Sequence, residues 1–440
     1  MHLSRRESYI MKAYSELNRE ELLALKSQLE AEYQDIKAKG LSLDMSRGKP
    51  SVEQLDLAEK MLGIITDNED VKAENGLDCR NYGAPIGLPE ARKLLGDIAG
   101  VSADRVILGG NSSLQLMFDT VSRSYSHGVL RSIPWSKLDC VKFLCPVPGY
   151  DRHFAVTEYF GVEMINIPMT EDGPDMDLVE KLVSEDPAVK GIWCVPKYSN
   201  PQGYVYSDET VRRMASLDPA AEDFRIYWDN AYGIHHLYEE AEKQAQIPDI
   251  LTECEKAQKP DMVYEFISTS KVSFAGGGIS AIISSDANLE QIKEYMSFQT
   301  IGNDKLNQLR HVKYFKSLDG VKAHMKKEAD ILRPKFEAVE SILEESLGGL
   351  GIGNWTRPLG GYFISFDAMP GCAKEIVVKA KEAGLVLTGA GATYPYGKDP
   401  KDSNIRIAPT CPTLSELILA AKVFAVSVKL ISAEHLLREM

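Results

Sequence analysis

Short apolar runs alternate with amphipathic segments over the middle of the chain. Seven of the runs are rich in β-branched and aromatic residues: RVILGG, VKFLCPVPG, VEMINIPM, VKGIWCVP, FRIYWDN, MVYEFIST and ISAIISS. Between some of them lie helical patterns such as NSSLQLMFDTVSRSY, DLVEKLVSE and SDETVRRMASL. Continuous apolar strands that alternate with helices are typical of a mostly parallel sheet covered on both faces. The pattern therefore predicts an α/β fold with a seven-stranded sheet.

The two ends of the chain show a different pattern. A helix is expected from Asn18, which has a glutamate three residues later as in a capping box, to a natural terminator at Gly40. A long helical stretch around residues 288–346 is followed by short strands, a helix and a final helix, which predict a smaller α+β unit.

Chain length supports a division into domains, because 440 residues exceed what a single core usually serves. We expect residues 1–76 to form an N-terminal helix and loop that pack with the small domain. Residues 77–310 would form the large domain, and residues 311–440 the small one.

Composition and charge limit the kinds of molecule and compartment that suit this protein. The formal charge of −14 opposes general binding to nucleic acid or to an anionic membrane. No apolar stretch approaches the roughly 18 residues of a membrane span. The seven scattered cysteines favour reduced thiols in the cytoplasm, and they form no metal motif. The leading MHLSRRESYIM has no apolar core, so no secretory signal is expected; a transit segment or a start at Met11 both stay open.

Polar residues follow four of the predicted strands at the point where each ends. These are the GGNSS run from Gly109, Asn200, Asp229 with Tyr232, and Ser268 and Ser270 with Lys271. In open parallel sheets a ligand lies outside the carboxyl ends of the strands. We therefore expect one site that gathers these side chains.

The motifs PGY, NPQG, DNAY, STSK and NIR occur in an order that resembles the PLP-dependent aminotransferases of fold type I. The resemblance runs from SRGKP to NIRIAP, and it is closest to the aspartate aminotransferase subgroup related to MocR-type aminotransferase-like proteins. It implies pyridoxal 5'-phosphate as cofactor, a large domain and a small α+β domain, and a homodimer with shared active sites.

The resemblance also implies roles for the residues around the cofactor ring. Lys271 matches the lysine that binds PLP covalently and later moves a proton, and Asp229 matches the acidic partner of the pyridine nitrogen. Tyr232 and Asn200 match the pair that hydrogen-bonds the phenolic oxygen. Tyr150 matches the aromatic residue that stacks on the ring. Each has a purely structural alternative, such as a solvated lysine, a helix cap or a core tyrosine.

Phosphate binding would fall to the start of the helix after the first strand. Backbone N–H groups and hydroxyls at a helix N-terminus suit an anion, and we assign Gly110, Asn111, Ser112 and Ser113, with Ser268 and Ser270 as helpers. A simple N-cap role is the alternative for each serine.

Two positions qualify this phosphate assignment. The family pattern has a phosphate-binding arginine eight residues after the lysine, but this chain has Ile279, behind three glycines. Either the glycine turn brings N–H groups to the phosphate or another cation does. Tyr82 resembles the tyrosine that reaches the partner subunit's phosphate.

Substrate recognition would rest on arginines. Arg406 matches the arginine that grips the α-carboxylate, with Asn200 beside it, because a planar guanidinium fits a planar carboxylate. For a second carboxylate, Arg47 in the SRGKP loop is the first candidate, Lys49 the second and Arg357 the third.

These observations predict a cytoplasmic, homodimeric aminotransferase. The resemblance favours L-aspartate and 2-oxoglutarate, converted to oxaloacetate and L-glutamate by a ping-pong mechanism on Lys271-bound PLP. The alternatives are another specificity (alanine, aromatic amino acids or kynurenine) or a PLP lyase. A ligand-sensing regulator is disfavoured, because about 75 residues precede the first predicted strand of the large domain and they read as helix and loop rather than as a winged helix.

Overall fold

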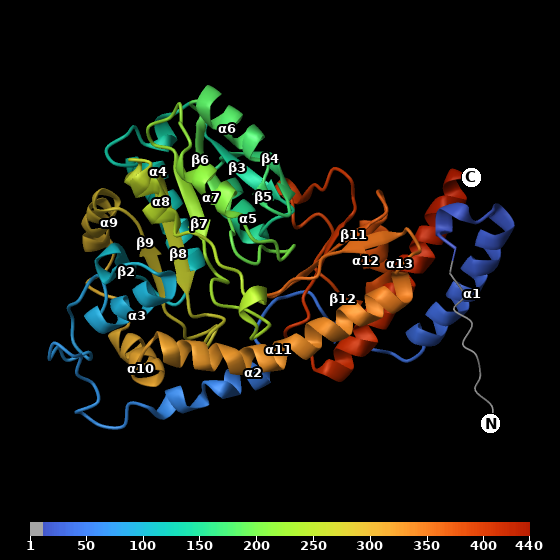
Figure 1. Ribbon diagram of the computed structural model, residues 1–440, viewed down its shortest axis with the longest axis horizontal. Helices are drawn as coiled ribbons and strands as arrows, with labels where there is room; N and C mark the ends of the chain where they lie inside the picture. The colour runs from blue at the N-terminus through green and yellow to red at the C-terminus, as the bar shows by residue number, and fades with distance from the viewer. Residues whose placement is uncertain (1–11) are drawn as a thin grey trace.

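A twisted eight-stranded sheet forms the centre of the larger part of the molecule (Figure 1). The computed structural model describes residues 12–440, so the expectations on residues 1–11 lie outside it. The strand order is β2 (Val106–Leu108), β9 (Ser280–Ile283), β8 (Val263–Ser268), β7 (Arg225–Asp229), β6 (Val189–Cys194), β3 (Lys142–Val147), β4 (Glu163–Thr170) and β5 (Gly173–Pro174).

Strand direction confirms the predicted mostly parallel sheet. Six strands run the same way, and only β9 and the two-residue β5 are antiparallel to their neighbours. The seven predicted strands are all present, and β5 is an addition that the apolar pattern does not show. Gly173, at a φ of 122°, lets the chain fold back directly after β4.

Helices cover both faces of this sheet. Those of the larger part are α3 (Pro89–Ala99), α4 (Ser113–His127), α5 (Asp151–Tyr159), α6 (Met176–Glu185), α7 (Asp208–Ala215), α8 (Ile250–Lys256), α9 (Asp286–Gln299) and α10 (Lys305–Phe315). Alternation along β7 sends Tyr227 into the core under α4, α5 and α9, and Trp228 into the core under α6, α7 and α8. Burial of both faces explains why these strands read as continuous apolar runs.

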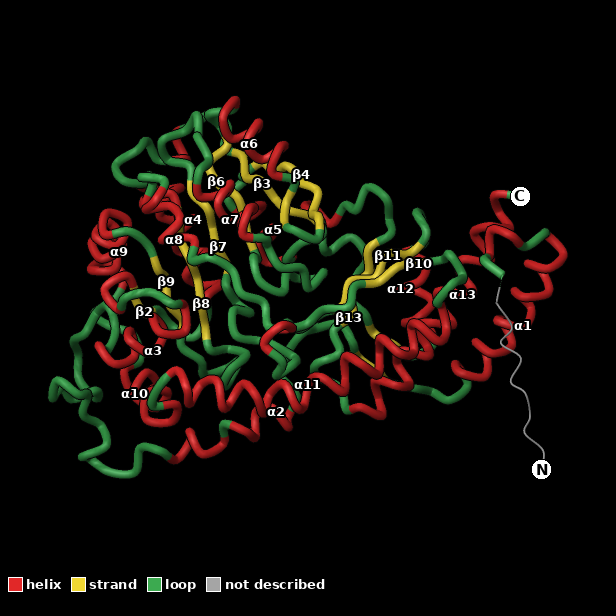
Figure 2. Tube along the Cα trace, in the orientation of Figure 1, coloured by secondary structure: helices red, strands yellow, loops and turns green. Residues whose placement is uncertain are grey.

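A second, smaller part lies beside the large sheet. Figure 2 shows its three-stranded antiparallel sheet, β10 (Gly353–Trp355), β11 (Ile364–Ala368) and β13 (Asn404–Ile407), set apart from the large one. It packs with α12 (Ala373–Glu382) and α13 (Leu414–Glu439). The long helix α11 (Leu318–Leu347) runs from the large sheet to this part (Figure 1).

The beginning of the described chain joins this smaller part. Helix α1 (Arg19–Lys37) starts with the expected capping box, in which Asn18 Oδ1 accepts from the Glu21 N–H at 3.0 Å and Glu21 Oε2 accepts from the Asn18 N–H at 2.8 Å. It packs along α13. The following strand β1 (Leu43–Asp44) pairs in parallel with β12 (Leu385–Val386), and α2 (Val52–Leu57) packs against α11.

The predicted helical stretch around residues 288–346 is three helices rather than one. The breaks fall before Asp304, which caps α10, and at Lys316 and Ser317, where Lys316 adopts a φ of 64° and Ser317 caps α11. Because α11 begins under the large sheet and ends in the smaller part, the division at residue 311 stays a prediction.

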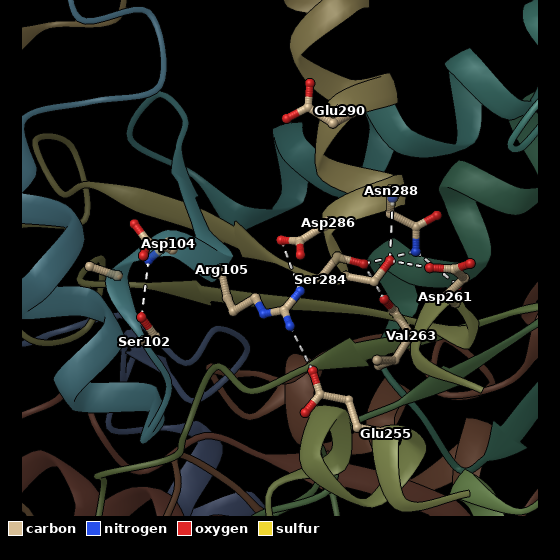
Figure 3. A network of polar contacts seen from close by, with 12 residues as sticks. Ser102, Asp104, Arg105, Glu255, Asp261, Val263, Ser284, Asp286, Asn288 and Glu290 are labelled. Atoms are coloured by element: carbon tan, nitrogen blue, oxygen red, sulfur yellow. Dashed lines mark hydrogen bonds and ion pairs between the residues drawn. The ribbon is translucent and has the colours of Figure 1, made fainter. Parts of the chain in front are cut away.

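A polar network fixes the amino-end edge of the sheet (Figure 3). Arg105, just before β2, pairs with Glu255 and Asp286, both at 2.9 Å. Asn288 Nδ2 donates to Ser284 Oγ at 2.9 Å, and that hydroxyl donates to the carbonyl of Val263 at 2.6 Å. The network ties α8, α9 and three strands together at the edge opposite the carboxyl ends. Over residues 12–440, no helix has the combined length and apolar character of a membrane-crossing segment.

Candidate active site

The predicted cofactor residues meet at the carboxyl ends of the parallel strands. Gly110 to Ser113 follow β2, Tyr150 follows β3, Asn200 follows β6, Asp229 ends β7, and Ser268, Ser270 and Lys271 end or follow β8. β6, β7 and β8 are neighbours in the sheet, so the three central residues start from adjacent strands.

Lys271 points its amine into an aromatic pocket. Its Nζ lies 4.8 Å from the centre of the Tyr232 ring and 5.9 Å from that of Tyr362. Burial lowers the pKa of Lys271, and the nearby Asp229 carboxylate offsets part of that effect. A lysine with a lowered pKa has a larger neutral fraction and is a better nucleophile.

Asp229 is buried, at 3% exposure, and has one paired and one free oxygen. Its Oδ2 lies 3.0 Å from Nε2 of His153 in α5, and this imidazole stacks on the Trp193 ring at 4.4 Å between centroids. Asp229 Oδ1 has no hydrogen-bond partner among the described residues. A buried carboxylate oxygen without a donor is costly, so the arrangement favours a ligand that donates a hydrogen bond there.

Tyr150 and Tyr232 flank this carboxylate. The Tyr150 ring lies edge-on to His153, with centroids 4.9 Å apart. Tyr232 is buried, and desolvation, followed by the neighbouring Tyr150 and Asp229, raises its pKa well above the usual value. Its hydroxyl therefore stays protonated at neutral pH and can donate a hydrogen bond to a ligand oxygen.

Arg406 reaches the site from β13 in the smaller part. Its Nη1 donates to Asp151 Oδ1 at 2.8 Å and to Asn200 Oδ1 at 3.3 Å. The guanidinium lies 4.9 Å from the centre of the Phe363 ring, and its Nε has no hydrogen-bond partner within residues 12–440. A buried guanidinium with an unused donor suits the capture of a carboxylate.

The predicted phosphate residues gather at the start of α4. Ser112 occupies the N-cap position, but its side chain makes no capping hydrogen bond. Ser270 Oγ donates to the carbonyl of Asn111 at 3.0 Å, which brings the loops after β2 and β8 together. Ile279 is buried in the core under α3 and α8, so position 279 contributes no charge to the site.

The SRGKP loop lies over Arg406, although its own arginine points to solvent. Gly48 lies directly on the Phe363 ring, and the carbonyl of Ser46 accepts from the Thr388 hydroxyl, which in turn accepts from Arg406 Nη2 at 3.4 Å. The Arg47 side chain is exposed, as is that of Lys49.

Two predicted residues are not part of this cluster within one chain. Tyr82 is 75% exposed. Arg357 is exposed and pairs with Glu344 at 2.5 Å, so it is engaged elsewhere.

Sequence reasoning missed several side chains of the site. His153 and Asp151 read as ordinary helix residues in YDRHF, and Tyr362, Phe363 and Thr388 as strand or loop residues. For His153 and Asp151, the one available signal in the sequence was their position just after the PGY motif.

Comparisons with known proteins agree with this geometry. The family model for aspartate amino-transferase matches residues 17–440. An aspartate aminotransferase of Corynebacterium glutamicum is 45% identical over 408 residues, which cover 92% of this chain and 93% of that protein. The crystal structure of an aspartate transaminase from the same organism superposes with a TM-score of 0.93 at 44% identity, covering 96% of this chain and 99% of the other.

A more distant structure shares the fold alone. An α-aminoadipate aminotransferase of Thermus thermophilus, solved with N-(5'-phosphopyridoxyl)-L-leucine, has a TM-score of 0.73 at 18% identity, over 91% of this chain and 95% of that one. The family model covers nearly the whole chain, and the 45% identity to the Corynebacterium glutamicum enzyme extends over most of both chains. Both comparisons therefore indicate the same family. The chain belongs to the aspartate amino-transferase family of PLP-dependent, fold-type-I aminotransferases.

Proposed function

We propose that this enzyme transfers the amino group of L-aspartate to 2-oxoglutarate, with PLP bound at Lys271. The observation that supports it most is the desolvated amine of Lys271 set beside Asp229 and Tyr232, with the buried Arg406 within reach of the same cluster. The relatives from Corynebacterium glutamicum favour aspartate as amino donor.

The residues present fit PLP. The free Oδ1 of Asp229 would accept from a protonated pyridine nitrogen, and the His153 contact holds the carboxylate in place for it. When bound, PLP supplies an electron sink for the bond that is broken at the substrate Cα. Tyr232 and Asn200 would donate hydrogen bonds to its phenolic oxygen. Tyr150 would cover its ring.

Phosphate binding would use the start of α4 in place of the family's arginine. Ser112 has an unused hydroxyl there, and Ser113 opens the helix, where N–H groups point outward. Ser270 holds the neighbouring Asn111 loop.

Lys271 would act as the base and acid of the reaction. Its lowered pKa would allow the neutral amine to take the proton from the substrate Cα and to deliver it to C4′ of the bound cofactor. Arg406 would bind the substrate α-carboxylate, which displaces Asp151 from its Nη1. Arg47, on the loop that covers Arg406, is the candidate for the second carboxylate, and its exposed side chain would have to turn towards the site to bind it.

Homodimerisation is part of this proposal. Tyr82 is 75% exposed, and Phe298 and Ile301 are 86% and 64% exposed. Gly302 lies against the carbonyl of Gly83, which places these two loops next to each other. An exposed apolar patch of this kind suits a subunit interface. A monomer in sedimentation at micromolar concentration would contradict the role of Tyr82.

The deciding experiment is the absorption spectrum of the purified protein with PLP. We expect a visible band that L-aspartate bleaches and 2-oxoglutarate restores, and we expect Lys271→Ala to lose both responses and steady-state turnover. Lys293→Ala, at an exposed ion pair with Glu290, is the matched control. Wild-type turnover by Lys271→Ala would overturn the mechanism. A band that responds to another amino acid but not to aspartate would replace the substrate.

A further inference from the structure

A cavity of about 600 Å³ lies apart from the proposed active site. Its walls come from the end of α3, the segment around residues 228–250 that follows β7, and the first turns of α11. Neither Lys271 nor Asp229 lines it. The volume is in the range of small-molecule sites in proteins.

Glu265 of β8 lies in the wall of this cavity at 2% exposure. It is in register with Trp228 of β7, whereas Asp229 follows Trp228 and therefore faces the other side of the sheet. Glu265 Oε1 accepts from Asn230 Nδ2 at 2.9 Å. Glu265 Oε2 and Asn230 Oδ1 are buried and have no hydrogen-bond partner within residues 12–440. Two buried polar atoms in one cavity wall thus lack hydrogen-bond partners, which is uncommon in folded proteins.

Most other charged groups around the cavity already have partners. Asp97 pairs with Lys93 at 2.6 Å, and Glu239 pairs with Lys326 at 2.9 Å. Lys197 donates to the carbonyl of Gly233 at 2.6 Å, and burial lowers its pKa to about 8. Lys322 of α11 also lines the cavity, but it is exposed to solvent. Within residues 12–440, the buried polar side-chain atoms of the wall that lack a partner are therefore Glu265 Oε2 and Asn230 Oδ1.

The surroundings of Glu265 favour binding of a positively charged group. Burial, with a further contribution from the charge of Asp249 on the same wall, raises the pKa of Glu265 to about 8, and the Asn230 hydrogen bond offsets this only in part. A cation placed beside the carboxyl group would favour its ionised form and form a charge-assisted hydrogen bond.

We propose that this cavity binds a small organic cation whose ammonium or guanidinium group donates to Glu265 Oε2 and Asn230 Oδ1. A metal ion fits less well, because residues 12–440 contain no group of three or more potential ligands arranged to hold one. An anion would meet Asp249 and Glu265 in the wall.

The cavity shares a wall with the active site. The segment that leaves β7 contributes Asp229 and Tyr232 to one site and Asn230 and His236 to the other. His235 follows Tyr232 and precedes His236 in this segment, and its Nε2 lies 3.2 Å from the carbonyl oxygen of Lys271. A bound cation would therefore contact the segment that positions the catalytic groups.

The test is calorimetric titration of the PLP-loaded enzyme with 1-butylguanidinium, which has no amine that reacts with the cofactor. Succinate is kept saturating so that Arg406 is engaged. We expect one site per chain, at least tenfold weaker binding of the neutral isostere butylurea, and release of close to one proton at pH 7 as Glu265 ionises. Glu265→Gln should weaken binding at least tenfold. Glu340→Gln is the matched control, because burial raises the pKa of Glu340 to about 7 outside this cavity.

Several results would overturn the proposal. These are no saturable binding at millimolar butylguanidinium, equal binding of butylurea, equal binding by Glu265→Gln, or binding that occurs without succinate and is lost when succinate is saturating. The butylurea and proton-release measurements use wild-type enzyme, so they decide the matter even where Glu265→Gln yields no folded protein.

Discussion

Two buried carboxyl groups, Asp229 and Glu265, lie on adjacent strands and face opposite sides of the same sheet. Both are at most 3% exposed, and each has one oxygen held by a neighbour and one oxygen without a partner. The neighbours differ: the imidazole of His153 contacts Asp229, and the side-chain amide of Asn230 donates to Glu265.

The difference shows how a fold sets the charge of a buried acid. Asp229 lies beside Lys271, and its free oxygen is the one that would accept from the cofactor ring in the proposed mechanism. Burial, with a smaller contribution from the charge of Asp249, opposes ionisation of Glu265 and raises its pKa, and the hydrogen bond from Asn230 offsets this only in part. A carboxyl group is thus proposed to bind the cofactor on one face of the sheet and a separate cationic ligand on the other.

The largest expected effect is that of Asp229→Asn. An amide cannot stabilise a protonated pyridine nitrogen, so we expect kcat for aspartate to fall by about 10²–10³-fold. Steady-state kinetics with 2-oxoglutarate measures this. Asp286→Asn, at the exposed ion pair with Arg105 on the far edge of the sheet, should stay within about twofold of wild type. Retention of more than a tenth of wild-type kcat by Asp229→Asn would refute the role.

Glu265→Gln tests the buried carboxyl group on the opposite face of the sheet. Glu265 keeps its proton up to about pH 8 when folded and loses it near pH 4.5 when unfolded. Its contribution to stability is therefore complete below pH 4.5 and is lost as pH rises towards 8. Relative to the variant, the wild-type free energy of unfolding should fall by roughly 2–4 kcal/mol from pH 5 to pH 8.5.

Denaturant titrations across this pH range provide the measurement. Glu340→Gln should show the same sign over a narrower window that ends near pH 7. A difference between wild type and Glu265→Gln that does not change with pH would mean that Glu265 is not protonated in the fold.

The smallest expected effect is that of His153→Gln. Glutamine keeps a hydrogen-bond donor for Asp229 but lacks the flat ring that stacks on Trp193 and fixes the donor in place. A hydrogen bond contributes on the order of 1 kcal/mol and glutamine would keep it only in part, so we expect kcat to fall on the order of tenfold. Steady-state kinetics with aspartate and 2-oxoglutarate measures this. An unchanged kcat would assign His153 to packing against Trp193 alone.

The sequence predicted those parts of the site that depend on strand ends. Asp229 and Lys271 follow apolar strands, and parallel strands bring their carboxyl ends together whatever their exact order. His153 could not be placed in the same way. Its contact with Asp229 requires β3 and β7 to flank β6, an order that no local pattern specifies.

Glu265 was missed for a related reason. In VYEFIS it reads as one acid in an otherwise apolar strand, and its burial depends on which segments cover that face. The pairing of β1 with β12 was equally out of reach, because two-residue strands have no pattern and join parts of the chain 342 residues apart (from Leu43 to Leu385).

The packing of α1 on α13 has a consequence for the synthesis of this protein. Lys37 leaves the ribosome 377 residues before Leu414, the start of the helix that covers it (414 − 37). At roughly 5–20 residues per second, the interval is on the order of tens of seconds. During it, the inward face of α1, formed by Leu22, Leu29 and Tyr33, has no partner. Among the described helices, α1 therefore has its apolar face exposed in the nascent chain for the longest interval before the helix that covers it is made.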